Sequence, residues 1–350
     1  MSSPLLSILF HSINQRKRAK ELVMSSPNGI VEQGFTPIGG IEQWISIRGE
    51  DRANPVLLLL HGGPASTYSV FIPTLQPWER HYTVVQWDQR GAGKTLRKNG
   101  DASVSGLSFE RLAQDAIEVI EYLRRRLGKD QIVLLGSSVG SLIGVMVAQR
   151  RPDMLSVFVG TDQNGPDTLD LSHQLTIARL RETGNTKGVK AVEDLWRNRP
   201  SWTPHNLNDY HQWVLKASAT MGIPNFALDV IFPAMMSSPN HTLRDVRDIV
   251  RGMKLSLDAL FHELMSFDLR RYGNSFAMPF YVFQGDSDLF TPAAAAKAYV
   301  DDIQAPQKTF VLIKNSGHLA AFTRPDQFLQ ELLLHVRPLA LGLAQTPRVS

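Results

Sequence analysis

The residues with the clearest chemical potential form the pentapeptide Gly136-Ser137-Ser138-Val139-Gly140, which has the pattern G-x-S-x-G. The apolar run IVLL precedes it and the run LIGVMVAQR follows it, so the sequence predicts a sharp turn between a strand and a helix. Such a turn strains the serine backbone and projects its hydroxyl above a sheet, where it can attack a substrate. We therefore predict Ser138 as a nucleophile. Ser137 and Ser141 compete only if the turn is shifted in register.

A serine hydroxyl is a weak nucleophile unless a base removes its proton. In one known arrangement the partners follow the serine in the order acid, then histidine, each at the end of a later strand. His318 follows the run TFVLI and is the predicted base, and Asp288 follows the run PFYVFQ and is the predicted orienting acid. Asp286 is expected to cap its turn instead. Asp162, after the run LSVFVGT, stays open as an alternative acid.

A second glycine turn, His61-Gly62-Gly63-Pro64, follows the run PVLLLL. Glycines there let backbone amides face the serine, and we predict that the N–H groups of Gly63 and Val139 form an oxyanion hole. Losing one donor of such a hole typically lowers the rate by about 10²–10³. His61 is expected to support this loop by hydrogen bonding rather than to act as a base.

The segment Gly91-Ala92-Gly93-Lys94-Thr95 ends like a phosphate-binding loop. That motif, G-x-x-x-x-G-K-[ST], requires a glycine where this chain has Asp88, so the pattern argues against an NTPase. The favoured interpretation is a tight turn after the run TVVQWD, with Asp88 and Arg90 available to pin neighbouring loops.

These residues need a sheet that brings the ends of several strands together. Short apolar runs predict strands at 44–49, 55–60, 83–88, 131–136, 155–160, 279–284 and 309–313, and several are apolar throughout, as in strands covered on both faces. The clearest helix is predicted at 109–127, capped by Ser108 and ended by Gly128. Another helix is expected to start at the alanine run 293–296, with Thr291 as its N-cap and Pro292 in its first turn. This alternation predicts an α/β fold with a mostly parallel sheet flanked by helices.

The strand–helix rhythm stops between about 163 and 270, where amphipathic stretches rich in Trp, His, Arg and Met replace the strand runs. We interpret this part as an inserted helical cap. The predicted organisation is an N-terminal helical extension (1–27), a first core part (28–162), a cap (163–272) and a second core part (273–350).

The composition excludes several classes of function. The chain of 350 residues has a formal net charge of only +4, with scattered basic residues, so no nucleic-acid partner is expected. It has no cysteine, which excludes disulfides, thiolate catalysis and cysteine metal sites. The apolar N-terminal stretch is too short to span a bilayer and lacks a secretory signal pattern, so a helix packed on the body is favoured over a membrane-surface helix. A cytoplasmic location is the expectation.

Five segments carry a family resemblance: HGGP at 61–64, DQRGAGKT at 88–95, GSSVGS at 136–141, GDSDLFTP at 285–292 and SGHLA at 316–320. Together they resemble the proline iminopeptidase branch of the α/β-hydrolase fold, over about 28–160 and 275–335. The resemblance implies Ser138, Asp288 and His318 as a catalytic triad, with Gly63 and Val139 as oxyanion donors. It also implies an α/β-hydrolase fold with an inserted helical cap.

The chain departs from that family where the substrate would be recognised. Iminopeptidases hold the free amino group of the substrate with cap glutamates, one of them directly after a tryptophan, but Val214 follows Trp213 here. Glu182, Glu193 and Glu263 remain as cap carboxylates, but none of them follows a tryptophan. The candidate substrate-binding residues are Trp213, Glu193 and Glu263.

The sequence therefore predicts a serine hydrolase that cleaves an ester or amide of a small-molecule or short-peptide substrate, with no metal or organic cofactor. Proline iminopeptidase activity is the alternative, and a catalytically silent receptor of the same fold is a weaker one.

Overall fold

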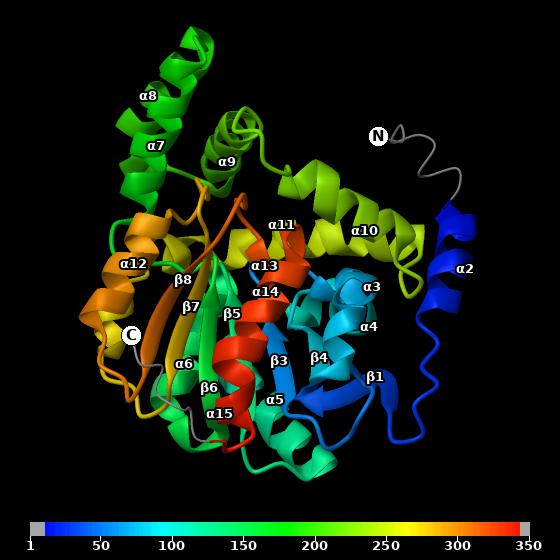
Figure 1. The fold of residues 1–350 in the computed structure, drawn as a ribbon. Helices are drawn as coiled ribbons and strands as arrows, with labels where there is room; N and C mark the ends of the chain where they lie inside the picture. Colours follow the sequence, from blue (N-terminus) through cyan, green and yellow to red (C-terminus); the bar gives the residue numbers. More distant parts are fainter. Residues whose placement is uncertain (1–10, 344–350) are drawn as a thin grey trace.

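The protein is built around one sheet. The computed structural model describes residues 11–343, and within them eight strands lie in the order β1-β2-β4-β3-β5-β6-β7-β8 (Figure 1). Their bounds are β1 (Ile30–Ile38), β2 (Ile41–Gly49), β3 (Val56–Leu60), β4 (Thr83–Asp88), β5 (Ile132–Ser137), β6 (Leu155–Thr161), β7 (Phe280–Gly285) and β8 (Lys308–Ile313). Strand β2 pairs antiparallel with β1 and β4, and all other pairs are parallel. The predicted mostly parallel sheet is confirmed.

Both faces of the sheet are covered. The helices outside the β6–β7 insertion are α2 (His11–Glu21), α3 (Ile72–Leu75), α4 (Gly93–Asn99), α5 (Phe109–Leu127), α6 (Val139–Arg150), α12 (Ala293–Asp302), α13 (Ala320–Thr323), α14 (Pro325–Glu331) and α15 (Arg337–Ala340). In β3, Leu58 and Leu60 join one apolar core with α5, α6 and α12, whereas Leu57 and Leu59 join a second core with α3, α13 and α14. Because successive side chains of a strand point to opposite faces, a strand buried on both sides must be apolar throughout.

Helix α5 shows how closely local signals can fix an element. It spans Phe109–Leu127, and the Ser108 side chain accepts a hydrogen bond from the Arg111 N–H at its start. Gly128 ends it in the left-handed conformation, with φ of 63°, which glycine adopts at little cost. Both predicted boundaries are confirmed.

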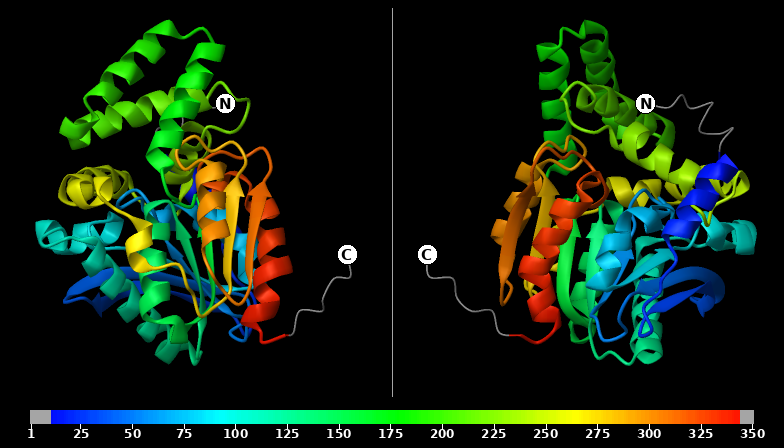
Figure 2. Two further views of the ribbon diagram at one scale, coloured as in Figure 1. Left: turned by 90° about the vertical axis from the view of Figure 1, so that its left-hand side faces the viewer. Right: turned by 45° about the vertical axis from the view of Figure 1, so that its right-hand side comes forward.

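The chain between β6 and β7 is helical. It contains α7 (Thr168–Glu182), α8 (Thr186–Arg197), α9 (Pro204–Ser218), α10 (Phe232–Ser237) and α11 (Leu243–Met265). Figure 2 shows α7, α8 and α9 standing above the carboxyl ends of β7 and β8. These three helices share an apolar core, formed in part by Leu180, Val192, Tyr210 and Val214. We call residues 168–265 the cap.

The other end of the cap is fastened to the body by polar contacts. Arg97 of α4 forms salt bridges of 2.7 Å with both Asp245 and Asp248 of α11. His241, just before α11, lies 3.0 Å from the buried hydroxyl of Ser69 through its Nε2. The part of the cap around α11 is therefore tied directly to the loops that surround the sheet.

Two local predictions need correction. Strand β1 was not predicted, because Gly34 and Pro37 interrupt its sequence and most of its residues are at least partly exposed, as is usual for an edge strand. Thr291 is not the N-cap of α12: Pro292 holds that position, and the Thr291 hydroxyl donates to Asp288 instead.

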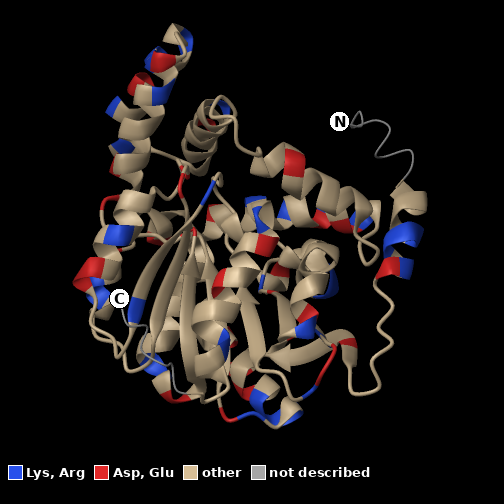
Figure 3. Ribbon diagram, in the orientation of Figure 1, with Lys and Arg blue, Asp and Glu red and all other residues tan. Residues whose placement is uncertain are grey.

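The charged side chains are mixed over the surface. Figure 3 shows Lys and Arg interspersed with Asp and Glu on the helices, with few charges on the inner strands. The basic helix α2, within the predicted N-terminal extension, packs on the body: His11 Nδ1 lies 2.8 Å from the Met236 carbonyl oxygen, and Gln15 donates to the Ser238 carbonyl. Residues 1–10 of that extension lie outside the described part. No helix among residues 11–343 has the length and apolarity needed to cross a membrane.

Candidate active site

Ser138 occupies a strained turn between β5 and α6. Its backbone has φ of 55° and ψ of −122°, a region that non-glycine residues rarely adopt. The turn is tight because a Cβ on Gly140 would lie only 2.2 Å from the carbonyl oxygen of Leu60. A Cβ on Gly62 would likewise lie 2.7 Å from Cβ of Ser138. The glycines therefore permit the close backbone approach that presents Ser138 to the cavity described below.

The neighbouring serines have other partners. Ser137 is buried, and its hydroxyl donates to Asp162 over 2.6 Å. Ser141 is also buried, and its hydroxyl donates to the Ser138 carbonyl over 2.7 Å. Neither lines the cavity into which Ser138 opens. The register of the turn is therefore the one expected from the sequence.

His318 and Asp288 are brought together by the loops after β8 and β7. His318 Nδ1 lies 2.8 Å from Asp288 Oδ2. Asp288 is only 3% exposed, and its carboxylate also accepts hydrogen bonds from the N–H groups of Phe290 and Thr291. A carboxylate beside Nδ1 favours the tautomer with its proton on that nitrogen, which leaves Nε2 as the basic atom.

The environment of His318 favours the protonated ring. Burial lowers the pKa of a histidine, but the carboxylates of Asp288 and Asp162 outweigh it and raise the pKa of His318 to about 9. The rings of Phe226 and Phe290 flank the imidazole, with centroids at 5.4 and 5.1 Å. His318 is thus an unusually strong base in a largely apolar setting.

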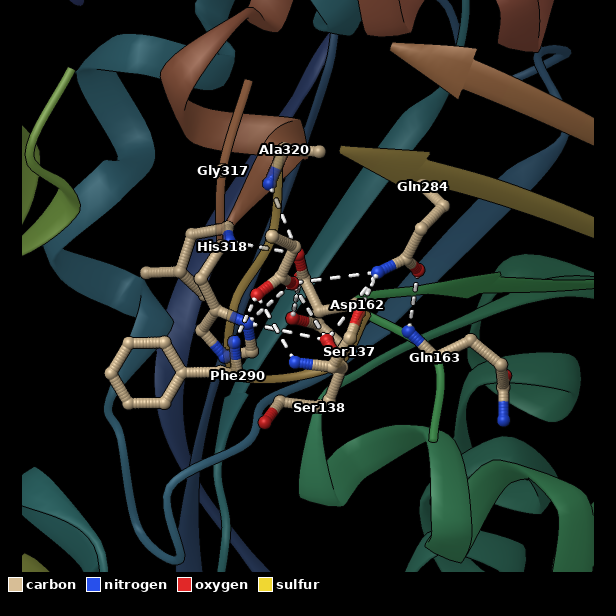
Figure 4. Close-up of polar contacts among 12 residues, drawn as sticks. Ser137, Ser138, Asp162, Gln163, Gln284, Phe290, Gly317, His318 and Ala320 are labelled. Atoms are coloured by element: carbon tan, nitrogen blue, oxygen red, sulfur yellow. Dashed lines mark hydrogen bonds and ion pairs between the residues drawn. The ribbon is translucent and has the colours of Figure 1, made fainter. Parts of the chain in front are cut away.

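The two other candidate aspartates, Asp286 and Asp162, accept hydrogen bonds from backbone N–H groups. Asp286 accepts hydrogen bonds from the N–H groups of Asn315 and Ser316, at 3.1 and 3.2 Å, so it joins the loops after β7 and β8. Asp162 accepts from the N–H groups of Leu319 and Ala320, at 2.7 and 3.2 Å (Figure 4). Neither carboxylate hydrogen-bonds to the ring of His318, whereas Asp288 does.

Ser138 and His318 line one cavity of about 470 Å³, together with Gly63 and Val139. Val139 is the first residue of α6, so its N–H has no acceptor in a preceding helical turn. Ser138 Oγ makes no hydrogen bond to His318 in this structure. Such contacts are often long before substrate binds and tighten in the complex.

His61 has the supporting position expected of it. Its Nε2 accepts a hydrogen bond from the Gln89 N–H over 3.2 Å, which ties the glycine loop after β3 to the loop after β4. Burial lowers the pKa of His61 to about 4, so the ring is neutral and Nε2 can accept. The loop after β4 is pinned as expected: Asp88 accepts from Ser69 and Lys94, and Arg90 pairs with buried Asp115.

The cavity walls combine apolar and charged groups. Part of the apolar wall comes from Leu142, Leu207, Leu264, Met265 and Phe290. The charged groups are Asp167, Asp170, Asp268, Arg199, Arg270 and Arg271. Two of these acids are already paired, because Asp170 and Asp268 each form a 2.9 Å salt bridge, with Arg199 and Arg270 respectively.

The predicted substrate-binding residues do not line this cavity. Glu263 accepts a hydrogen bond from the Phe109 N–H at the start of α5, and Glu193 forms a 2.7 Å salt bridge with Arg181 on the outside of the cap. The Trp213 ring lies under the ammonium group of Lys216, 3.9 Å from its centroid. The sequence could not distinguish a cap carboxylate that faces inward from one engaged elsewhere.

Several residues of the site had no signal in the sequence. Asn164 donates from its side chain to the Ser138 carbonyl over 3.0 Å, and it follows the end of β6, the edge at which functional side chains of such sheets gather. Tyr68 contacts Ser137 through its hydroxyl at 2.7 Å. His211 of the cap faces the cavity, and burial lowers its pKa to about 4.

One cluster has spacing suitable for a metal. The candidate ligand atoms of Asp162, Asp288 and His318 lie within 4.8 Å of one another. Their hydrogen bonds account for this closeness, because Asp288 holds the imidazole and Asp162 holds backbone N–H groups and the Ser137 hydroxyl. The donors already occupy the oxygens that a metal would need.

Comparison with known proteins places the chain among hydrolases. Residues 55–183 match the family model of the alpha/beta hydrolase fold. The chain is 28% identical to a protein of Bacillus subtilis named probable aminopeptidase YbaC, over 86% of this chain and 94% of that protein. It is 24% identical to a proline iminopeptidase of Lacticaseibacillus rhamnosus, over 86% and 97% of the two chains.

Solved structures agree on the fold. The structure of VinJ matches 88% of this chain and 99% of its own, with 20% identity and a TM-score of 0.62. A proline iminopeptidase of Mycobacterium smegmatis matches 89% and 99% of the two chains, with 18% identity and a TM-score of 0.61. The sheet, its flanking helices and these similarities agree: the chain is a hydrolase of the α/β-hydrolase fold that resembles the proline iminopeptidases.

Proposed function

We propose that this hydrolase cleaves an ester or amide of a small-molecule substrate through a covalent acyl-enzyme on Ser138. One observation carries the proposal: Ser138, in its strained turn, opens into the same cavity as His318, whose Nδ1 is held 2.8 Å from buried Asp288. A nucleophile, a base and a group that orients the base are the parts that acyl transfer requires.

In the first half-reaction, Ser138 Oγ attacks the carbonyl carbon while His318 Nε2 takes its proton. The carbonyl oxygen becomes an anion and is stabilised by the N–H groups of Gly63 and Val139. When the tetrahedral intermediate collapses, Nε2 returns the proton to the departing alcohol or amine. In the second half-reaction, a water molecule gives a proton to Nε2 while its oxygen attacks the acyl carbon. The bond from that carbon to Ser138 Oγ then breaks, Nε2 returns the proton to Oγ, and the acid is released. Asp288 holds the tautomer and stabilises the imidazolium throughout. No metal or organic cofactor takes part.

We further propose that the acyl or leaving group is neutral and fairly apolar. Leu142, Leu207 and Phe290 supply apolar wall in the cavity that Ser138 and His318 line. A substrate ammonium needs a carboxylate partner, because a buried unpaired cation costs several kcal/mol. Glu193 and Glu263 are engaged away from the cavity.

Release of N-terminal proline remains the second candidate. Asp167 lines the cavity and forms no salt bridge with another residue in 11–343, so it is a carboxylate that a substrate amine could use. Two relatives with similarity over most of the chain carry aminopeptidase names. Asp167 therefore takes the place that the sequence prediction gave to Glu193 and Glu263.

A fluorophosphonate probe tests the proposed chemistry. The wild-type protein should be labelled on Ser138 and should hydrolyse at least one member of a panel of p-nitrophenyl esters, proline p-nitroanilide and small lactones. The Ser138→Ala variant should stay folded but should not be labelled, and its kcat should be lower by about 10⁶-fold. Labelling of the Ala variant would refute the nucleophile, and a folded wild-type protein that resists the probe would favour the silent receptor.

A further inference from the structure

A buried chain of hydrogen bonds runs behind Ser138. The Tyr68 hydroxyl lies 2.7 Å from Ser137 Oγ, and Ser137 Oγ lies 2.6 Å from Asp162 Oδ2. Tyr68, Ser137 and Asp162 are at most 3% exposed. The Ser137 hydroxyl has one hydrogen and gives it to Asp162, so the Tyr68 hydroxyl must be the donor to Ser137. Both hydrogen bonds, from Tyr68 to Ser137 and from Ser137 to Asp162, are therefore donated in the direction of Asp162.

The second oxygen of Asp162 holds the turn that carries His318. Oδ1 accepts the N–H groups of Leu319 and Ala320, the two residues directly after the histidine (Figure 4). Leu319 has φ of 63°, a left-handed conformation that a leucine adopts only when its surroundings impose it. The two hydrogen bonds to Asp162 supply that constraint.

The hydrogen bonds favour the ionised form of Asp162. Burial and the nearby carboxylate of Asp288 raise its pKa. Against this, each of its recorded partners is a donor, and a carboxylate that accepts several N–H or O–H bonds is stabilised as the anion. A protonated Asp162 would have to give its hydrogen to Ser137 Oγ, which would reverse the hydrogen bonds from Ser137 and Tyr68. The imidazolium of His318 adds to the preference for the anion.

The titratable groups around His318 are then few. Asp288 contacts the ring at Nδ1, Asp162 faces it from the end of β6, and His211 faces it from α9 in the cap. His211 is neutral because burial lowers its pKa to about 4. The two carboxylates are therefore the charges that decide how strongly His318 holds its proton.

We propose that Asp162 is a positioning residue for His318: its carboxylate clamps the turn after the histidine and, as a second anion facing the imidazole, stabilises the protonated ring. The proposal builds on the proposed role of His318 as the base and adds to it. Asp288 selects the tautomer by direct contact. Asp162 fixes where the ring lies and adds negative charge without touching it.

The substitution Asp162→Asn separates the two effects. Asparagine keeps an oxygen for the N–H groups of Leu319 and Ala320 but removes the charge. The acid limb of the kcat/KM–pH profile should therefore move to lower pH by about one unit, as expected when a single nearby charge is lost. Asp162→Ala removes the clamp as well and should in addition lower kcat by about 10²-fold, the effect of misplacing a reacting group by about 1 Å.

A direct titration makes the test independent of turnover. In a Ser138→Ala background, the pKa of His318 can be followed by the NMR signal of its Nδ1 proton, with and without Asp162→Asn. A lower pKa in the Asn variant supports the proposal. Identical values, or coincident pH profiles, overturn it. Because this measurement needs no activity, it stands even if Ser138 is not the nucleophile, which the fluorophosphonate experiment decides separately.

Two further results are informative. If Asp162→Asn does not fold, Ser137→Ala removes one donor but keeps the charge, and it should lower kcat by about 10-fold without moving the acid limb; an unchanged kcat would refute the clamp. The opposite result is that Asp162→Asn lowers kcat by about 10⁴-fold while Asp288→Asn does not. In that case Asp162 is the orienting acid, and the positioning role is wrong.

Discussion

Asp288 Oδ2 lies 2.8 Å from His318 Nδ1, and the same oxygen accepts the hydroxyl hydrogen of Thr291 at 2.7 Å. The Thr291 hydroxyl thus fixes the position of the carboxylate that orients the imidazole. Asp288→Asn should lower kcat by about 10⁴, because an amide in this position can stabilise the wrong tautomer. The matched control is Asp286→Asn, two residues away, which accepts hydrogen bonds from the next loop's backbone and from the Ser287 hydroxyl but does not contact His318, and should change kcat far less. Equal losses from the two variants would contradict the assignment of the acid.

The pH dependence of kcat/KM should be unusual for a histidine base. The pKa of His318 is raised from the ordinary value of 6.5 to about 9. Only the neutral ring can accept the serine proton, so kcat/KM should rise about tenfold per pH unit below that value and level off above it. Initial rates with a substrate whose leaving group does not titrate between pH 6 and 10 would measure this rise of kcat/KM with pH. A limb centred near 6.5 would show that the two carboxylates do not act on the ring as described.

The buried ion pair of Arg90 and Asp115 should matter for folding. Asp115 is fully buried and accepts hydrogen bonds from Arg90, Arg111 and Gln43. Asp115→Ala leaves the buried Arg90 guanidinium unpaired and should lower the free energy of unfolding by about 3–5 kcal/mol, measured by urea denaturation. Asp258→Ala breaks the exposed Lys254–Asp258 pair and should cost less than about 1 kcal/mol. Similar costs for the two variants would show that the network around Asp115 is not stabilising.

Gly140 should tolerate no side chain. A Cβ there would lie 2.2 Å from the backbone oxygen of Leu60, so the turn and β3 would have to separate. Gly140→Ala should cost about 1–3 kcal/mol of stability from overpacking and should also lower kcat, because Ser138 would move. Gly34→Ala is the control, since a Cβ at Gly34 meets nothing within 4 Å. An active, fully stable Gly140→Ala variant would exclude the tight approach of these loops.

The charge of the substrate can be tested with matched pairs. If the preferred substrates are neutral, acylating the amine of an amino-acid amide should leave kcat/KM unchanged or raise it, because the desolvation cost of the cation disappears. The comparison needs one leaving group throughout, such as p-nitroaniline. A steep drop on acylation would favour the iminopeptidase alternative. In that case Asp167→Asn should reproduce the drop on the free amine, and the engaged Glu193 serves as the control position.

Local signals were sufficient for seven of the eight strands and for the position of the proposed reacting residues after strand ends. Strands buried on both faces, such as β3, appear as continuous apolar runs, and the ends of such strands are where Ser138, Asp288 and His318 occur in the sequence. Strand β1 was missed because an exposed edge strand has neither an apolar run nor regular alternation. Thr291 was assigned to the helix start because its type suits a cap, yet its hydroxyl is used by Asp288.

Contacts between distant segments could not be predicted in this way. The hydroxyl of Tyr68 meets Ser137 across 69 positions of the chain, and Glu263 meets the Phe109 N–H across 154. Neither contact leaves a local pattern of residue types. The direction in which a cap side chain points depends on how the cap helices pack, and this is why the sequence could not show that Glu193, Glu263 and Trp213 lie outside the lining of this cavity.

The position of the cap in the chain has an evolutionary consequence. Residues 168–265 enter after β6 and leave before β7, whereas Ser138, Asp288 and His318 all belong to loops of the sheet. Mutations in the cap can therefore reshape part of the cavity wall while the proposed reacting groups are inherited unchanged. In this way, proteins that descend from one ancestor can diverge in substrate specificity while they keep the same reacting groups. Such a history leaves sequence similarity concentrated in the loops of the sheet.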